Sequence, residues 1–550
     1  MLLLLPPLLL VTVVLHASVA GGESLDLHLR YQSPVAPGTD RFHTQTREEQ
    51  WAAEQTAVIV CDMWDSHTSV NAVRRVIELA PHIHRFCTEL RERGVTIIHA
   101  PSSCMAAYEG HPARLRAVHT PAADAFPPHI GAWCDQIPAE ERAAYPLDQS
   151  DGGWDDDPEE RSRWHQRLQA DGRDPRAPWQ RQTPLIPIDA DRDYISDDGR
   201  EIWSILHHRG IDNVLLVGVH TNMCVLGRPF GLRRLASNGK NVALVRDLTD
   251  TMYDPRDWPY CSHFTGTDRI VDHIERHVCP TITSNQVLGG SPFRFRDDRR
   301  LHLVMLIAED EYGTEETLPD FAARHLGQHF RVTTLYGSQQ ERHRIVGSQA
   351  IDEADVLLIS IRRRALPEED LERIRRFVAA GKPMIGIRTA SHAFSLRGQE
   401  PPPGHAVWET FDPDVWGGHY AGHHANDLTC RVVPGEGDAL EHPIVKAAQV
   451  AGFPAGGSLY RVSPLEPGAG VLAWGMAAGV DPQPVAWTFV RRDGGRSFYT
   501  SLGHPRDFDT AEFPALLAAA IHWTAGLPLP TAEEVAAQHA RYASGRGRQR

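Results

Sequence analysis

The first clear strand of this chain is an unbroken apolar stretch, AVIVC (57–61). A helical stretch follows it, and a second apolar strand, VTIIHA (95–100), comes next. Strands that are apolar along their whole length are typical of parallel sheets covered by helices on both faces. The alternation continues through a helix at 198–209 and strands at 213–219 and 241–247. We therefore predict an α/β domain built around a parallel sheet.

The same alternation begins again after a polar stretch at 291–300, which we place between two domains. The strands predicted in this second block lie at 301–308, 331–336, 354–361 and 383–388, and its clearest helix at 368–382. The predicted fold class is α/β, with two doubly wound, mainly parallel-sheet domains. The predicted layout is a signal peptide at 1–20, a lead-in at 21–50, a domain at 51–290 with an insertion at 104–183, a linker at 291–300, a domain at 301–530 and a tail at 531–550.

The composition excludes several classes of protein. The chain has 550 residues, of which 41% are hydrophobic and 23% charged, as in ordinary globular proteins. Its 56 basic and 71 acidic side chains give a net charge of -15, which repels nucleic acid and anionic lipid surfaces. Lysine occurs only at Lys240, Lys382 and Lys446. We therefore expect no nucleic-acid partner.

The N-terminus resembles a secretory signal. Residues 1–20 are apolar and end in small residues, which predicts cleavage before Gly21 and a secreted or periplasmic protein with no membrane attachment. An uncleaved membrane anchor is the alternative, disfavoured by the Pro6-Pro7 pair and the short apolar run. The eight cysteines are too sparse for a disulfide scaffold, although an oxidising compartment permits one or two bridges.

Two reactive side chains directly follow predicted strands. Asp62 comes after the first strand, and Cys224 opens a predicted helix that runs to about residue 238. Ligands of open α/β sheets bind at the carboxyl ends of the strands, and a helix N-terminus lowers the pKa of a thiol. This pattern favours Cys224 as a nucleophile and Asp62 as its proton acceptor. A buried structural thiol is the alternative.

Three segments resemble the isochorismatase-like cysteine hydrolases: VIVCDMWD (58–65), GVHTNMCV (218–225) and NGKNVALVRDLTD (238–250). The resemblance implies a Rossmann-type three-layer sandwich, homo-oligomers, and an Asp-Lys-Cys site that hydrolyses a C–N or related bond of a small molecule. It places the proton acceptor at Asp62 and the nucleophile at Cys224, with an oxyanion hole formed by the Met223 and Cys224 N–H groups. It also implies a cis peptide between Val219 and His220, and we expect His220 and Trp64 to bind substrate.

The lysine of that family is absent. It would fall within PLIPIDADRDYISD (184–197), which contains no lysine, and we propose Arg192, or else Arg181, as the fixed positive charge. A guanidinium stays protonated, so it could not exchange a proton as lysine does. The residues after the aspartate, Met63 and Trp64, also depart from the family pattern.

A metal site is a second hypothesis for the same edge of the sheet. Asp65, His67 and His99, with Asp62, follow neighbouring strands, and mixed carboxylate and imidazole ligation suits zinc or manganese. His67 and His99 could instead bind substrate or cap loops. The thiol mechanism itself requires no cofactor.

Histidines gather in four predicted loops of the second block: RTASHAF (388–394), WGGHYAGHH (416–424), EHPI (441–444) and SLGH (501–504). We expect these loops to form one polar cleft in which Trp408, Trp416 and Tyr460 offer flat surfaces for sugars. A set of unconnected surface turns is the alternative.

The same loops, with GRSFYTSLGH (495–504) and HWTAG (522–526), resemble the ThuA-like family. The resemblance implies a class I glutamine amidotransferase-like fold and a role in sugar metabolism, and the recurring histidines of the family fall at His392, His419, His423, His442 and His504. The amidotransferase cysteine is missing, because the turn after the strand at 383–388 reads Arg388-Thr389-Ala390-Ser391.

Two functional hypotheses follow. The first is a secreted hydrolase that cleaves an amide-type bond through Cys224 and carries a carbohydrate-related second domain. The alternative is a catalytically degenerate first domain beside a second domain that binds or processes a saccharide.

Overall fold

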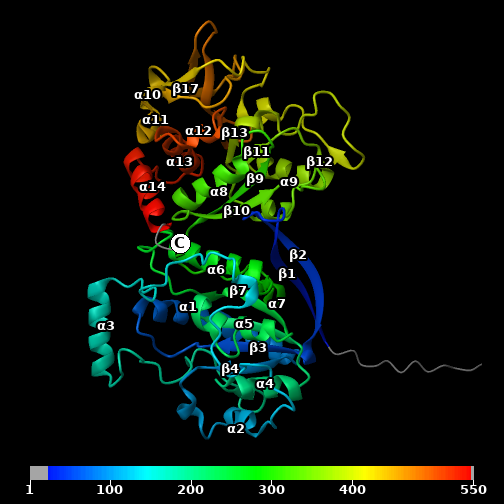
Figure 1. Ribbon diagram of the computed structural model, residues 1–550, viewed down its shortest axis with the longest axis vertical. Coiled ribbons are helices and arrows are strands. Elements are labelled where there is room, and N and C mark those ends of the chain that lie inside the picture. Colours follow the sequence, from blue (N-terminus) through cyan, green and yellow to red (C-terminus); the bar gives the residue numbers. More distant parts are fainter. Residues whose placement is uncertain (1–22, 547–550) are drawn as a thin grey trace, which may run out of the picture.

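The computed structural model describes residues 23–546 (Figure 1). The predicted signal peptide at 1–20 and the last four residues of the predicted tail lie outside the described residues. Two α/β regions, each built on its own sheet, lie one above the other in Figure 1. The predicted fold class is therefore confirmed as an α/β chain with two mixed, largely parallel sheets.

The first sheet has eight strands in the order β2-β1-β8-β7-β6-β3-β4-β5. The strands from β8 to β5 in this order run parallel. The strands are β1 (Ser24–Pro34), β2 (Phe42–Ala52), β3 (Thr56–Cys61), β4 (Thr96–Ala100), β5 (Tyr194–Ile195), β6 (Asn213–Val219), β7 (Asn241–Asp250) and β8 (Thr281–Ile282). The helices of this region are α1 (Val70–Glu92), α2 (Pro112–His119), α3 (Pro158–Ala170), α4 (Gly199–His208), α5 (Leu232–Ser237), α6 (His263–His277) and α7 (Asn285–Leu288).

Both faces of this sheet are covered. Along β3, Ile59 and Cys61 belong to one hydrophobic cluster, while Val58 and Val60 belong to another on the opposite face. Successive side chains of a strand point to opposite faces, so a strand buried on both faces must be apolar throughout. This is why the unbroken apolar stretch at 57–61 predicted the sheet.

The predicted lead-in at 21–50 forms a hairpin. β1 and β2 pair antiparallel along their whole length, and Arg30 of β1 pairs with Thr281 of β8. Leu25, Leu27 and Leu29 are buried between exposed neighbours, an alternation typical of a strand with one face on a core. The hairpin reaches the second region, where Val35 joins the hydrophobic core.

The second sheet has nine strands in the order β10-β9-β11-β13-β19-β18-β17-β15-β16. The first five in this order are parallel and the remainder pair antiparallel. The strands are β9 (Leu301–Ala308), β10 (Phe330–Tyr336), β11 (Val356–Ile361), β13 (Met384–Ile387), β15 (Cys430–Pro434), β16 (Phe453–Pro454), β17 (Ala469–Ala477), β18 (Gln483–Val490) and β19 (Arg496–Thr500), and a separate small pair is formed by β12 (Leu366–Pro367) and β14 (His405–Ala406). The helices are α8 (Thr314–His325), α9 (Glu368–Ala379), α10 (Asp438–Glu441), α11 (Pro443–Ala448), α12 (Pro505–Phe508), α13 (Glu512–Thr524) and α14 (Ala532–Arg546).

The C-terminal segment is a helix where a tail was predicted. α14 lies beside α8 at the junction of the two regions (Figure 1). Its Tyr542 is buried and contacts Trp258 of the first region, with ring centroids 5.8 Å apart. The last helix therefore packs against both regions.

Two further features concern the cysteines and the length of the helices. All eight cysteines are buried free thiols, so neither of the permitted disulfide bridges is formed. Within residues 23–546, no helix is both long enough and apolar enough to cross a membrane.

Gly218 gives a direct test of the contact between β6 and β3. Its φ is +110°, and an added Cβ would lie 2.0 Å from the carbonyl oxygen of Cys61. Gly239 also has a positive φ, +83°, but an added Cβ there meets no atom within 4 Å. Because both alanine substitutions carry the backbone penalty and only one adds a clash, we expect Gly218→Ala to cost at least about 2 kcal/mol more than Gly239→Ala. Denaturant unfolding of the two variants measures this difference, and equal losses would show that the strands can separate without cost.

Candidate functional site

Asp62 lies at the carboxyl end of β3 with its carboxylate fully buried. Its φ of +46° is in the left-handed region, which turns the side chain out of the strand direction. Oδ1 accepts a hydrogen bond from the Ser102 N–H at 2.8 Å, and Oδ2 accepts one from Arg228 Nε at 2.9 Å. The loop after β4 and the segment after Cys224 therefore both bind this carboxylate.

Cys224 lies in a single π-helical turn, Thr221–Val225, directly after β6. The peptide bond between Val219 and His220 is cis, as predicted. Asn222 exchanges two hydrogen bonds with the backbone of Met252, which ties the turn to the segment after β7. The predicted helix at 224–238 is interrupted, because Pro229 lacks an N–H and α5 begins only at Leu232.

The Cys224 thiol and the Asp62 carboxylate are joined by a hydrogen bond. Burial, and then the negative charge of Asp62, raise the pKa of the Cys224 thiol far above its ordinary value. Burial also raises the pKa of Asp62, while Arg228 and the bonds from Cys224 and Ser102 lower it. The Cys224 thiol is therefore protonated near neutral pH, and it donates its hydrogen bond to Asp62. The predicted lowering of the thiol pKa is wrong for this arrangement, since burial outweighs the helix terminus.

Arg228 supplies the fixed positive charge beside Asp62 that we predicted from Arg192 or Arg181. Arg192 is exposed on the surface and pairs with Glu92 and Asp189, so it does not reach Asp62. Arg181 contributes only backbone groups, to Asp65. Arg228 could have been found from the sequence, because it lies four residues after Cys224 and side chains four residues apart share one face of a helix.

Three other residues were predicted around the thiol: His220, Trp64 and Met223. His220 and Trp64, predicted to bind substrate, are buried and line a cavity next to Asp62. The N–H of Met223, predicted for the oxyanion hole, already donates to the carbonyl oxygen of His220 at 3.0 Å. A substrate oxygen would have to replace that bond.

The cavity beside Asp62 is small. Its volume is about 10 Å³, room for about one water molecule. It is lined by Asp62, Trp64, Ser66, His67, Val73, Val76, Val219 and His220. Buried polar atoms without a hydrogen-bond partner occur on Ser66 (Oγ) and His220 (Nε2), so the cavity offers two unused polar groups.

The insertion at 104–183 covers this site. Trp179 stacks on Trp64 with ring centroids 4.6 Å apart, and Tyr145 Oη donates to the carbonyl oxygen of Asn222 at 3.2 Å. Trp133 lies against the Arg228 guanidinium, 5.6 Å from ring centroid to Cζ. Aromatic side chains from three parts of the insertion therefore close the site from outside.

The predicted zinc or manganese site does not assemble. Asp65 binds Arg173 and the Gln180 N–H, and His99 lies between Gln182 and Asp193. His67 Nδ1 accepts the Ser69 N–H, and burial lowers the pKa of this imidazole to about 4. Within the described residues, the ligand atoms of Asp65, His67 and His99 do not converge. Each of the three is held by its own structural partners.

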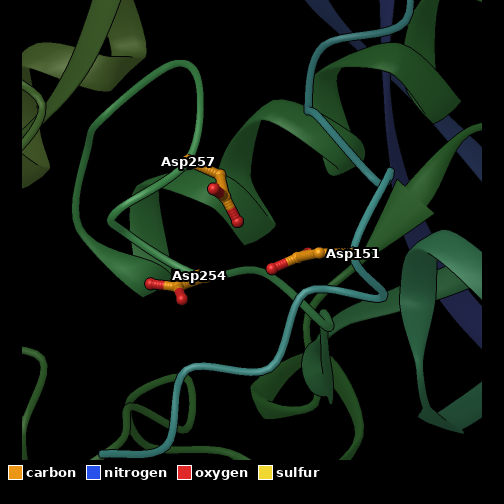
Figure 2. Close-up of side chains that lie close together, drawn as sticks. All are labelled: Asp151, Asp254 and Asp257. Atoms are coloured by element: carbon orange, nitrogen blue, oxygen red, sulfur yellow. The ribbon is translucent and has the colours of Figure 1, made fainter. Parts of the chain in front are cut away.

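Three carboxylates do converge elsewhere in the first region. Figure 2 shows Asp151 of the insertion facing Asp254 and Asp257, which follow β7. Arg256 already pairs with Asp254, at 2.6 Å between Nη2 and Oδ2, so the cluster carries its own cation. Burial, and the nearby charges of Asp151 and Asp254, raise the pKa of Asp257 to about 6.

The histidines predicted in the second region divide between two edges of its sheet. His392 follows β13 and contacts Tyr420 and Tyr460, while His504 follows β19 and contacts Tyr312. His419 is exposed and pairs with Asp412, and His423 forms a backbone bridge with Tyr460. These four belong to the carboxyl edge, as predicted.

His442 does not belong to that cleft. It caps α11 and packs against Trp523, which also contacts Arg496 at the start of β19. His504 follows the end of the same strand, so the two histidines lie at opposite edges of the sheet. Of the aromatic residues predicted for sugar stacking, Trp416 is buried in the core and donates to the Ala390 carbonyl oxygen.

Sequence comparison identifies the second region. The family model described as ThuA, trehalose utilisation, matches residues 304–524. The second region is a ThuA domain. The predicted ThuA resemblance is thereby confirmed, and no curated protein matches the chain.

Solved structures with distant similarity are of two kinds. A ThuA-like protein from Bacteroides uniformis is 15% identical, with a TM-score of 0.33, over 43% of this chain and 95% of its own. A cysteine hydrolase from Pseudomonas syringae pv. phaseolicola is 15% identical, with a TM-score of 0.24, over 43% of this chain and 92% of its own. An isochorismatase family protein from Burkholderia thailandensis is 14% identical, with a TM-score of 0.24, over 42% of this chain and 94% of its own.

Because the pKa of Asp257 is raised, we predict that replacing its carboxylate with a neutral side chain stabilises the protein at neutral pH but not at acidic pH. A carboxyl with a folded pKa of about 6 and an unfolded pKa of ~3.9 opposes folding above pH 6 and ceases to do so below pH 4. Since Asp257 is partly solvated, we expect Asp257→Asn to raise the free energy of unfolding by only about 1 kcal/mol at pH 7. The gain should vanish at pH 4.

Denaturant unfolding at the two pH values measures this, with the exposed Asp481→Asn as the matched control. A gain that persists at pH 4, or one that the control shares, would contradict the assignment.

Proposed function

We propose that the first region is a thiol hydrolase of the isochorismatase-like kind, acting on a C–N bond of a small molecule. The observation that carries the proposal is the buried Asp62 carboxylate bonded to both Cys224 and Arg228. A carboxylate next to a thiol can take its proton, and a fixed cation bonded to the carboxylate favours its ionised form. Arg228 replaces lysine in this proposal.

The first half of the reaction forms a thioester. The Cys224 thiol gives its proton to Asp62 while sulfur attacks the amide carbonyl carbon, and the carbonyl oxygen gains the negative charge. Asp62 then gives the proton to the leaving nitrogen as the C–N bond breaks. Because the guanidinium of Arg228 stays charged throughout, it orients and stabilises Asp62 and transfers no proton.

The second half releases the acid. Water gives a proton to Asp62 and attacks the thioester carbonyl, and the proton passes back to the departing Cys224 sulfur. His220 is unsuited to this role, because burial lowers its imidazole pKa well below neutrality. His67 is likewise neutral near pH 7, since its pKa is about 4. Asp62 is therefore the proton carrier in both halves.

The closed cavity limits the substrate. A space of about 10 Å³ admits no substrate until the insertion moves away from Trp64 and Arg228. The side chains that would then be uncovered are Trp64 and the Asp62 carboxylate with its partner Arg228. These favour a small substrate with a flat apolar part beside the scissile amide.

Substitution at the proposed triad tests the mechanism. We expect Cys224→Ala to lower kcat/KM at least ~10³-fold against any amide that the protein hydrolyses, because the nucleophile is lost. Arg228→Gln should lower it more than about tenfold, because Asp62 loses the partner that keeps it charged. Ammonia release from a panel of small amides measures both.

Matched controls separate chemistry from folding. Cys279→Ala removes another buried free thiol, and Arg192→Gln removes the exposed arginine first predicted for the site. Both should keep full activity. Activity that survives Cys224→Ala would contradict the proposal, and a protein that hydrolyses none of the amides would favour the alternative of a degenerate first region.

A further inference from the structure

Arg388 is a buried cation that the proposed hydrolase site does not use. It directly follows β13, an inner strand of the second sheet, with a φ of +48°. Only 1% of its surface is exposed. A buried charge is costly unless a charge of the opposite sign or a full set of hydrogen bonds compensates it.

The partners of this guanidinium are incomplete. Nη1 donates to the Ser501 carbonyl oxygen at 2.5 Å, and Nη2 lies 3.5 Å from Ser458 Oγ. Nε is buried and has no acceptor. Within the described residues, no carboxylate lies within 4.0 Å of the guanidinium; the nearby Asp507 accepts backbone N–H groups of Gly456, Gly503 and His504 instead.

Two tyrosine rings and a backbone segment pack around the guanidinium. The guanidinium carbon lies 3.9 Å from the ring centroid of Tyr312 and 5.0 Å from that of Tyr460. Gly457 approaches so closely that an added Cβ would lie 2.2 Å from Nη2. A glycine at 457 therefore lets a backbone segment lie directly over the guanidinium, where a larger residue would collide with it.

More positive charge surrounds the same edge of the sheet. Arg363 follows β11, the neighbouring strand, and its buried Nε also lacks an acceptor. The Arg363 N–H donates to the carbonyl oxygen of His392. Burial, and then the charges of Arg363, Arg362, Arg397 and Arg388, lower the pKa of the His392 imidazole to about 2. Arg363 and Arg388 therefore both lie near His392, at the carboxyl ends of β11 and β13.

We propose that this edge of the ThuA domain is a binding site for a small organic anion, a carboxylate or phosphate held by Arg388 and Arg363. Guanidinium groups recognise both oxyanions through paired N–H donors. The tyrosine rings of residues 312, 420 and 460 would pack against the ring-shaped body of the ligand. Parallel α/β sheets bind ligands at this edge. The site is separate from Cys224, so it can function whether or not the first region is a hydrolase.

Isothermal titration of the full chain with four probes tests the proposal: glucuronate, glucose 6-phosphate, inorganic phosphate and uncharged glucose. We expect at least one anionic sugar to bind at least tenfold more tightly than glucose. Tighter binding of glucuronate would identify a carboxylate ligand, and tighter binding of glucose 6-phosphate and phosphate would identify a phosphate ligand. Failure of all three anions to bind at millimolar concentration, or equal binding of glucose, would overturn the proposal.

Three variants locate the site. Arg388→Met should abolish anion binding and raise the thermal midpoint of the unliganded protein, because it removes a buried charge without a carboxylate partner. Arg363→Gln, at a partly exposed position, should weaken binding at least tenfold with the fold intact. Arg431→Met, on the exposed face of β15, is the control and should bind as the wild type does. Undiminished anion binding by both Arg388→Met and Arg363→Gln would overturn the assignment.

Discussion

The buried carboxylate of Asp62 is the group on which the first region depends. A negative charge without solvent must be compensated by hydrogen bonds, and three segments supply them: the Ser102 N–H after β4, the Cys224 thiol after β6 and the Arg228 guanidinium beyond it. These groups can meet only if β4, β3 and β6 lie side by side in parallel register, as they do. Pairing this one charge therefore requires that order of strands. The same contacts place a thiol and a guanidinium beside the carboxylate.

The two regions use the same position of the α/β fold in opposite ways. Asp62 and Arg388 each follow a buried strand, and each adopts a left-handed φ, +46° and +48°. Asp62 is an anion whose partners are present, and a nucleophile is one of them. Arg388 is a cation whose partners are incomplete. The first arrangement is suited to moving a proton, and the second to receiving an anion from outside.

Sequence patterns predicted the parts of the fold that local physics determines. Apolar strands such as 57–61, 213–219 and 301–308 were located correctly. The positions after the first two identified Asp62 and Cys224 as neighbours. Arg228 was missed because the cation was sought within 184–197, although the helix predicted from Cys224 already placed residues 224 and 228 on one face. Arg192 was chosen by analogy with a family position, but two nearby carboxylates hold it at the surface. His442 was misplaced because a histidine at a helix cap has no sequence feature that tells which edge of the sheet it will occupy.

Titration of the Cys224 thiol tests most directly whether Cys224 is a neutral thiol bonded to Asp62. The pH dependence of thiolate absorbance, taken as the difference between the protein and its Cys224→Ala variant, gives the pKa of this one thiol. We expect a pKa above the ~8.5 of an ordinary cysteine, and a lower pKa in Asp62→Asn, because that substitution removes the neighbouring negative charge. Asp62→Asn should thus form the thiolate more readily while losing hydrolytic activity. A thiol pKa below 8.5 in the unaltered protein, or a pKa that rises in Asp62→Asn, would contradict the account.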